Sequence, residues 1–193
     1  MTARWVVDEV AAERDLNITW QPISLLFKNE PAEDSPYYGR VVGSHRMLRV
    51  MEAVRASEGD GPTFPLYWEF ASRIHHDGQA DVDVADTLAA VGLDTSYAAA
   101  ADDEAWDAEI RSRMDAGLEL VGQDVGTPII AWNRPDGQRL GIFGPVITRA
   151  PTGEDALKLW DGMMMMCEVD GFWELKKTRT ERPEFGDRPS IPT

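Results

Sequence analysis

The chain contains one cysteine, Cys167, so it offers a single thiol for nucleophilic chemistry. A thiolate attacks disulfides, but it forms at neutral pH only where a cation, a base or a helix N-terminus lowers the pKa of the thiol. This cysteine follows Leu157, Trp160 and Met164 at spacings of 3, 4 and 3, on one face of a helix. We therefore expect Cys167 to be a small buried hydrophobic residue and not a nucleophile. Two-cysteine redox chemistry cannot occur within these 193 residues.

The other chemistry-bearing residue types indicate no metal or nucleotide site. His45 and His76 have no partner at the spacing of zinc ligands. The 34 acidic residues include no pair whose spacing demands acid–base catalysis. The glycine-rich patterns that hold phosphate groups are absent from the sequence. We therefore expect neither a metal nor a nucleotide cofactor.

Composition limits the classes of partner. The net charge of −15 repels nucleic-acid backbones and anionic lipid surfaces, so we expect no nucleic acid and no membrane as a partner. The hydrophobic fraction of 43% suits one folded core, with or without a smaller inserted lobe. The sequence has no apolar run near the roughly 20 residues that cross a bilayer, and its acidic N-terminus does not resemble a signal peptide. These features predict a cytoplasmic protein.

The elements that position these side chains follow from hydrophobic periodicity. Residues 3–15 have apolar positions at helical spacing, residues 17–22 alternate as a half-buried strand does, and the prolines of 23–39 predict a loop. Residues 40–122 are predicted to be helical throughout. Their apolar stripes are Met47, Val50, Met51 and Val54; Tyr67, Phe70, Ala71 and Ile74; Val84, Leu88 and Val91; and Trp106, Ile110, Met114, Leu118 and Val121.

Extended structure is expected again near the C-terminal end. Residues 128–132 and 139–143 are short apolar runs on either side of a Pro-Asp-Gly turn, which predicts an antiparallel hairpin. A further helix is expected to begin at Thr152 or Gly153. This order of elements predicts an α/β fold with one small mixed sheet and a helical insertion.

Several segments resemble a known family. They are Val-Gly-Gln-Asp-Val-Gly-Thr-Pro (121–128), Phe-Gly-Pro-Val (143–146), Gly-Glu-Asp-Ala-Leu-Lys-Leu-Trp-Asp (153–161) and Glu-Leu-Lys-Lys-Thr-Arg-Thr-Glu-Arg-Pro-Glu-Phe (174–185). Ala-Arg-Trp-Val-Val-Asp-Glu-Val-Ala (3–11) and Ser-Leu-Leu-Phe-Lys-Asn-Glu (24–30) match as well. Together they resemble the mycothiol-dependent reductases of actinobacteria, nitroreductase-like members of the DsbA superfamily.

The resemblance implies a thioredoxin-like, DsbA-type fold whose first strand is missing here. The chain would then comprise a truncated N-terminal thioredoxin-fold part (1–39), an all-helical insertion (40–121) and a C-terminal thioredoxin-fold part (122–193) with a cis-proline hairpin. The implied activity is that of a thiol–disulfide oxidoreductase. Mycothiol, a low-molecular-weight thiol, would be the cofactor, and a small thiol or disulfide would be the substrate.

The sequence departs from the family at its front. The family places a strand and a Cys-Pro-Trp-Cys turn directly before the helix that here begins at Thr2, and this sequence has neither. A cysteine at that helix N-terminus would have its thiolate stabilised by the helix dipole and by free backbone N–H groups. We therefore expect the native start to lie upstream of Met1, and the printed chain to be inactive in this chemistry.

The resemblance also implies four residues that bind the thiol or the substrate: Thr127, Pro128, His75 and Asn29. Pro128 would be a cis-proline, and Thr127 before it would offer backbone hydrogen bonds to a bound thiol. His75 is alternatively a surface histidine at a helix C-terminus, where the helix dipole favours its charge. Asn29 is alternatively a turn residue ahead of Pro31.

Two other functions stay open. A serine in place of the redox cysteines would indicate a thioredoxin-fold isomerase or a kappa-type thiol transferase. A native protein without the cysteine pair would instead be non-catalytic and bind a thiol or a peptide near Pro128.

Overall fold

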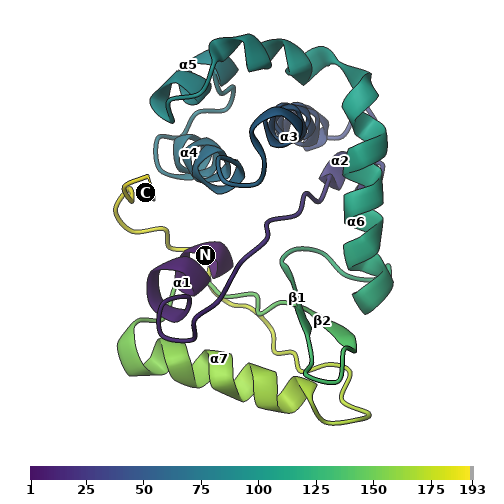
Figure 1. Cartoon of the computed structure of the whole chain (residues 1–193), viewed down its shortest axis with the longest axis vertical. Helices are drawn as coiled ribbons and strands as arrows, with labels where there is room; N and C mark the ends of the chain where they lie inside the picture. Colours follow the sequence, from purple (N-terminus) through teal and green to yellow (C-terminus); the bar gives the residue numbers. More distant parts are fainter. Residues whose placement is uncertain (192–193) are drawn as a thin grey trace. The chain divides into compact units, whose positions relative to one another are not determined.

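The computed structural model describes residues 1–191 and shows a helix-rich α/β chain with one small two-stranded sheet (Figure 1). The chain divides into two compact units. Unit 1 comprises Met1–Ile18 and Gly117–Gly186, and unit 2 comprises Thr19–Ala116 together with the segment from Asp187 onward. The three-part organisation expected from the sequence, with boundaries at 39 and 121, stays a prediction.

Unit 1 contains the sheet. Its elements are α1 (Thr2–Trp5), the π-helical turn η1 (Val6–Val10), β1 (Ile129–Asn133), β2 (Arg139–Phe143) and α7 (Gly153–Cys167). The predicted hairpin is confirmed, because β1 and β2 pair antiparallel with Ala131 opposite Gly141. Gly137 closes the turn between them at φ +87°, a backbone conformation that glycine adopts without steric penalty. The helix predicted to begin at Thr152 or Gly153 is also confirmed.

The core of unit 1 lies between its first helical turns and α7. Trp5 and Val10 are fully buried, and Ala156 of α7 is buried against them. The helix predicted over 3–15 is confirmed only as far as Val10, because the chain continues as turns. Asp15 closes these turns at φ +49°, a left-handed conformation that is typical of helix ends.

Unit 2 is built from helices. They are α2 (Leu25–Asn29), α3 (Tyr38–Glu58), α4 (Thr63–His75), α5 (Val84–Ala90), the 3₁₀ helices η2 (Thr95–Asp102) and η3 (Glu104–Trp106), and α6 (Asp107–Val121), whose last turns belong to unit 1. The predicted helical block is thereby confirmed. Val54 of α3, Leu66 of α4 and Leu88 of α5 are fully buried in one cluster, so the predicted stripes pack on one another. Among residues 1–191 we find no helix that is long and apolar enough to cross a membrane.

The strand predicted over residues 17–22 is wrong, since this stretch has no regular secondary structure. The Trp20 ring stacks on Phe64 at a centroid distance of 4.5 Å, and the Trp20 carbonyl accepts a 2.8 Å hydrogen bond from the Arg55 guanidinium. A strand would need a neighbouring backbone to satisfy that carbonyl, and here a side chain does so instead.

The loop predicted over residues 23–39 is also partly wrong, because α2 forms within it. Ser24 begins this helix as its N-cap: the Ser24 hydroxyl oxygen accepts a 3.2 Å hydrogen bond from the Phe27 N–H. Glu30 ends it in a left-handed conformation at φ +42°. The loop prediction gave too much weight to the prolines that follow the helix.

Candidate functional site

Two proline peptides meet at the end of the hairpin in unit 1. The Thr127–Pro128 bond is cis, as expected, and the Gly144–Pro145 bond is cis as well. The Gly144 N–H donates a 2.8 Å hydrogen bond to the Pro128 carbonyl, so the two segments are joined directly. Thr127 is exposed and Pro128 is half-buried.

The first turn of α1 is attached to the same place. The Thr2 hydroxyl donates a 2.8 Å hydrogen bond to the Pro145 carbonyl. We call Thr2, Thr127, Pro128, Gly144 and Pro145 the proline face. Both hydrogen bonds have backbone carbonyls as acceptors; one donor is a backbone N–H and the other is the Thr2 hydroxyl.

Apolar side chains flank the proline face. Phe143 and Val146, on either side of Gly144–Pro145, are both exposed. A partly exposed backbone segment with apolar neighbours can bind a small ligand through both hydrogen bonds and apolar contact. The sequence identified Thr127 and Pro128, and it did not identify Thr2 or Gly144.

Cys167, the only thiol, ends α7 and is not part of the proline face. The predicted packing against a hydrophobic core is confirmed, but Cys167 is half-buried and not buried as expected. Burial raises the pKa of the Cys167 thiol. A thiol with a raised pKa is mostly protonated at neutral pH and is therefore a poor nucleophile.

The other two predicted site residues belong to unit 2. Asn29 is the last residue of α2, and His75 is the last residue of α4; both are exposed. The position of His75 at a helix C-terminus agrees with its alternative interpretation as a surface histidine. The binding roles of Asn29 and His75 remain predictions.

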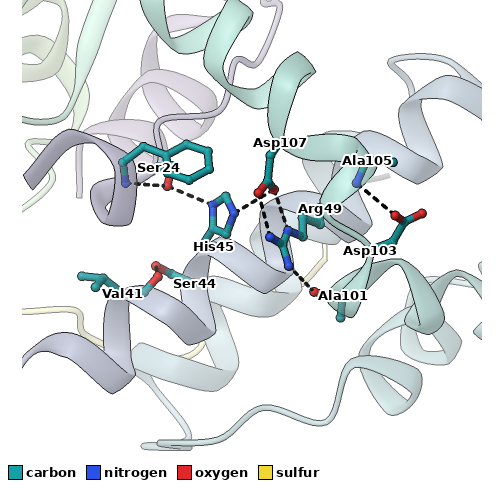
Figure 2. A network of polar contacts seen from close by, with 10 residues as sticks. Ser24, Val41, Ser44, His45, Arg49, Ala101, Asp103, Ala105 and Asp107 are labelled. Carbon is teal, nitrogen blue, oxygen red and sulfur yellow. Dashed lines mark hydrogen bonds and ion pairs between the residues drawn. The ribbon is translucent and has the colours of Figure 1, made fainter. Parts of the chain in front are cut away.

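A buried polar network in unit 2 was not predicted (Figure 2). Ser24 Oγ lies 2.9 Å from His45 Nδ1, and His45 Nε2 lies 3.0 Å from Asp107 Oδ1. Asp107 also accepts two hydrogen bonds from Arg49, at 2.6 and 2.8 Å. His45 is 2% exposed and Ser24 is 1% exposed. Burial lowers the pKa of His45, while the hydrogen bond to Asp107 opposes that effect.

No metal-binding group is evident in the described part of the chain: residues 1–191 contain no cluster of three or more His, Cys, Asp or Glu side chains that could hold an ion. Unit 1 offers a partly exposed backbone segment with apolar neighbours and, outside that segment, a thiol whose pKa is raised by burial.

The family comparison agrees with the segments on which the sequence resemblance rests. A family model described as Rv2466c-like, mycothiol-dependent nitroreductase Rv2466c, matches residues 1–177. The match includes the first turn of α1, the proline face, the helices of unit 2 and the whole of α7. The chain therefore belongs to the Rv2466c-like family of mycothiol-dependent nitroreductases.

Proposed function

We propose that this chain belongs to the DsbA-like, thioredoxin-fold type of thiol–disulfide oxidoreductase, and that its proline face binds mycothiol. The observation that carries the proposal is the pair of hydrogen bonds at this face, from Gly144 N–H to Pro128 O and from Thr2 Oγ1 to Pro145 O. They hold the first turn of α1 next to a half-buried proline segment. Membership of a mycothiol-dependent family supplies the ligand class.

The residues of the proline face fit a small thiol. Thr127 is exposed, so its backbone groups can pair with polar groups of the ligand. Phe143 and Val146 offer apolar contact on either side of Gly144–Pro145. Mycothiol supplies reducing equivalents: two thiols become one disulfide and release two electrons and two protons to the substrate.

The proposed reaction also requires a nucleophile. Formation of a mixed disulfide needs a cysteine thiolate beside the bound thiol. Cys167 does not meet this need, because burial raises its pKa and it lies outside the proline face. For the 193-residue chain we therefore expect mycothiol binding without turnover.

One specific observation favours a second candidate, a non-catalytic thiol-binding protein. The sequence has a single cysteine, and that cysteine is half-buried. The two candidates differ in turnover by the native protein, while both require mycothiol to bind at the proline face.

The test is calorimetric titration of mycothiol into the 193-residue chain and two threonine variants. Thr127→Glu places a charged side chain on the proline face, whereas Thr178→Glu makes the same change at another exposed position of unit 1. We expect Thr127→Glu to weaken binding at least about tenfold, or about 1.4 kcal/mol, and Thr178→Glu to bind as the parent does. A parent chain that does not bind mycothiol would refute the function. Equal affinities of the parent and Thr127→Glu would refute the assignment to the proline face.

A further inference from the structure

The buried network of unit 2 has one consistent arrangement of protons. Hydrogen bonds from Arg49 lower the pKa of Asp107, so its carboxylate is ionised and only accepts. His45 Nε2 must then carry the proton of the neutral ring, and His45 Nδ1 accepts. The Ser24 hydroxyl therefore donates to Nδ1, while its oxygen accepts the Phe27 N–H at 3.2 Å.

The order Ser24–His45–Asp107 is that of a serine hydrolase triad, but the surroundings do not suit hydrolysis. The Ser24 side chain belongs to a residue that is 1% exposed, so a substrate carbonyl cannot reach its oxygen. That oxygen already accepts the Phe27 N–H as a helix cap. The network has a different consequence, which concerns the short helix that begins at Ser24.

Helix α2 needs support from outside itself. It has five residues, none of them fully buried, and an isolated helix of this length is unstable in water. Its residue Phe27 contacts the network, since the Phe27 and His45 ring centroids lie 4.4 Å apart. The Arg111 guanidinium lies over the face of the Phe27 ring, 3.8 Å from its centroid. The helix ends at Asn29, so the orientation of Asn29 depends on the same contacts.

We infer that His45 is a positioning residue: it links the Arg49–Asp107 ion pair to the Ser24 hydroxyl, and the oriented hydroxyl caps α2 and fixes the helix that carries Asn29. The Arg49–Asp107 ion pair fixes the position of His45, because Arg49 of α3 and Asp107 of α6 are joined by two hydrogen bonds. His45 in turn orients the Ser24 hydroxyl, whose O–H group would rotate freely without the acceptor Nδ1.

Backbone amide exchange measured by NMR tests this role without any ligand. In His45→Gln the side-chain NH2 group can take the place of the ring Nε2–H and still donate to Asp107, but no acceptor then stands at the position of Nδ1, which orients the Ser24 hydroxyl. We expect protection of the Phe27 amide to fall about tenfold, equivalent to about 1.4 kcal/mol. The amides of Ile130 and Ile142 in the hairpin of unit 1 should keep their protection. Unchanged protection of Phe27 would overturn the inference.

Two variants of the cap make the test independent of the fold of His45→Gln. Ser24→Ala removes only the hydroxyl and should reproduce the loss at Phe27, whereas Ser24→Thr keeps the hydroxyl and should retain protection. A long-range ¹H–¹⁵N spectrum of the parent should show His45 as the Nε2–H tautomer. Loss of protection in Ser24→Thr equal to that in Ser24→Ala, or an Nδ1–H tautomer, would contradict the proton arrangement.

Discussion

The indole N–H of Trp5 donates a 3.1 Å hydrogen bond to the carbonyl of Ala156, and this contact joins the first helical turn of the chain to α7. Trp5 is fully buried, and its ring meets the Trp160 ring edge-on at a centroid distance of 5.9 Å. One side chain therefore supplies both an aromatic contact within the unit 1 core and a buried polar link.

Replacing Trp5 by Phe should lower the free energy of unfolding by about 1–3 kcal/mol, because the donor to Ala156 is lost and the smaller ring leaves a gap beside Trp160. Trp173→Phe is the matched control, since Trp173 is 90% exposed; it should change stability by less than about 0.5 kcal/mol. Urea denaturation measures both. Equal effects of the two substitutions would show that Trp5 does not anchor the core.

Gly141 in β2 should tolerate no side chain. A Cβ atom there would lie 2.8 Å from Leu120 Cβ, so the last turns of α6 would have to move away from the hairpin. We expect Gly141→Ala to cost about 1–3 kcal/mol of stability. Gly162→Ala makes the same chemical change inside α7, where a Cβ atom meets nothing within 4 Å, and should stabilise by up to about 1 kcal/mol. Thermal denaturation should give opposite signs, and shifts of the same sign would contradict this account.

The sequence predicts the turns and helices, because these features depend on residues that lie close together along the chain. The turn at Gly137 follows from its Pro-Asp-Gly residues, and Asp136 Oδ1 accepts the Gln138 N–H at 2.9 Å as such turns do. The helical stripes of unit 2 were recognisable because burial repeats every three or four residues. The coarse class, a helix-rich α/β chain with a small sheet, follows from these elements alone.

The failures have a different origin. Alternation around Trp20 indicates that one face is buried, but not whether the burying neighbour is a strand or, as here, the rings of Phe64 and Tyr67. The buried network joins residues 21 and 62 positions apart, and no single-sequence pattern connects them. Of the residues in this network, only Ser24 has a role that the local sequence indicates, since serine is a preferred N-cap before an apolar helical segment.

The lone thiol should react slowly. Because burial raises the pKa of Cys167, less thiolate is present at pH 7 than in a free cysteine, and access is restricted as well. We expect iodoacetamide to alkylate the folded chain at least about tenfold more slowly than the urea-unfolded chain, with the rate rising as the pH is raised. Cys167→Ala should leave mycothiol affinity unchanged. Faster alkylation of the folded chain would identify Cys167 as an activated nucleophile.

The buried carboxylate of Glu52 should be essential for the packing of α3 against α6. Glu52 is 1% exposed, and its Oε2 atom lies 3.2 Å from Arg55 Nε and 3.1 Å from Arg113 Nε. Glu52→Gln removes the buried charge that these two arginines share, while Arg55 keeps its ion pair with Asp60 and Arg113 keeps its ion pair with Glu109; we expect it to destabilise by about 1–3 kcal/mol. Glu154→Gln is the control, because its ion pair with Lys158 is exposed and should contribute less than about 1 kcal/mol. If urea denaturation shows that both variants lose the same stability, the distinction between a buried and an exposed ion pair would be contradicted.

The buried histidine of unit 2 should make stability depend on pH. Burial lowers the pKa of His45 in the folded state below its ordinary value, with Arg49 and Arg111 acting in the same direction and Asp107 opposing them. The unfolded chain then binds more protons than the folded chain as the pH falls below about 6.5, so acidification favours unfolding. The stabilisation from neutral His45 is fully present above that pH and is lost progressively as the pH falls through the folded-state pKa.

His45→Gln isolates this contribution, since His75 and His76 remain in both proteins. Above pH 7 the parent should be the more stable protein, because it retains the hydrogen bond between Ser24 and His45. Urea denaturation at pH values from 7.5 to 5 should show the difference between the two proteins narrowing as the pH falls, because only the parent must protonate a buried imidazole. A difference that stays constant over this range would mean that His45 has the same proton affinity in the folded and unfolded chains. A difference that widens on acidification would reverse the sign and would indicate a charged His45 paired with Asp107, which is incompatible with the neutral Nε2–H ring inferred for the network.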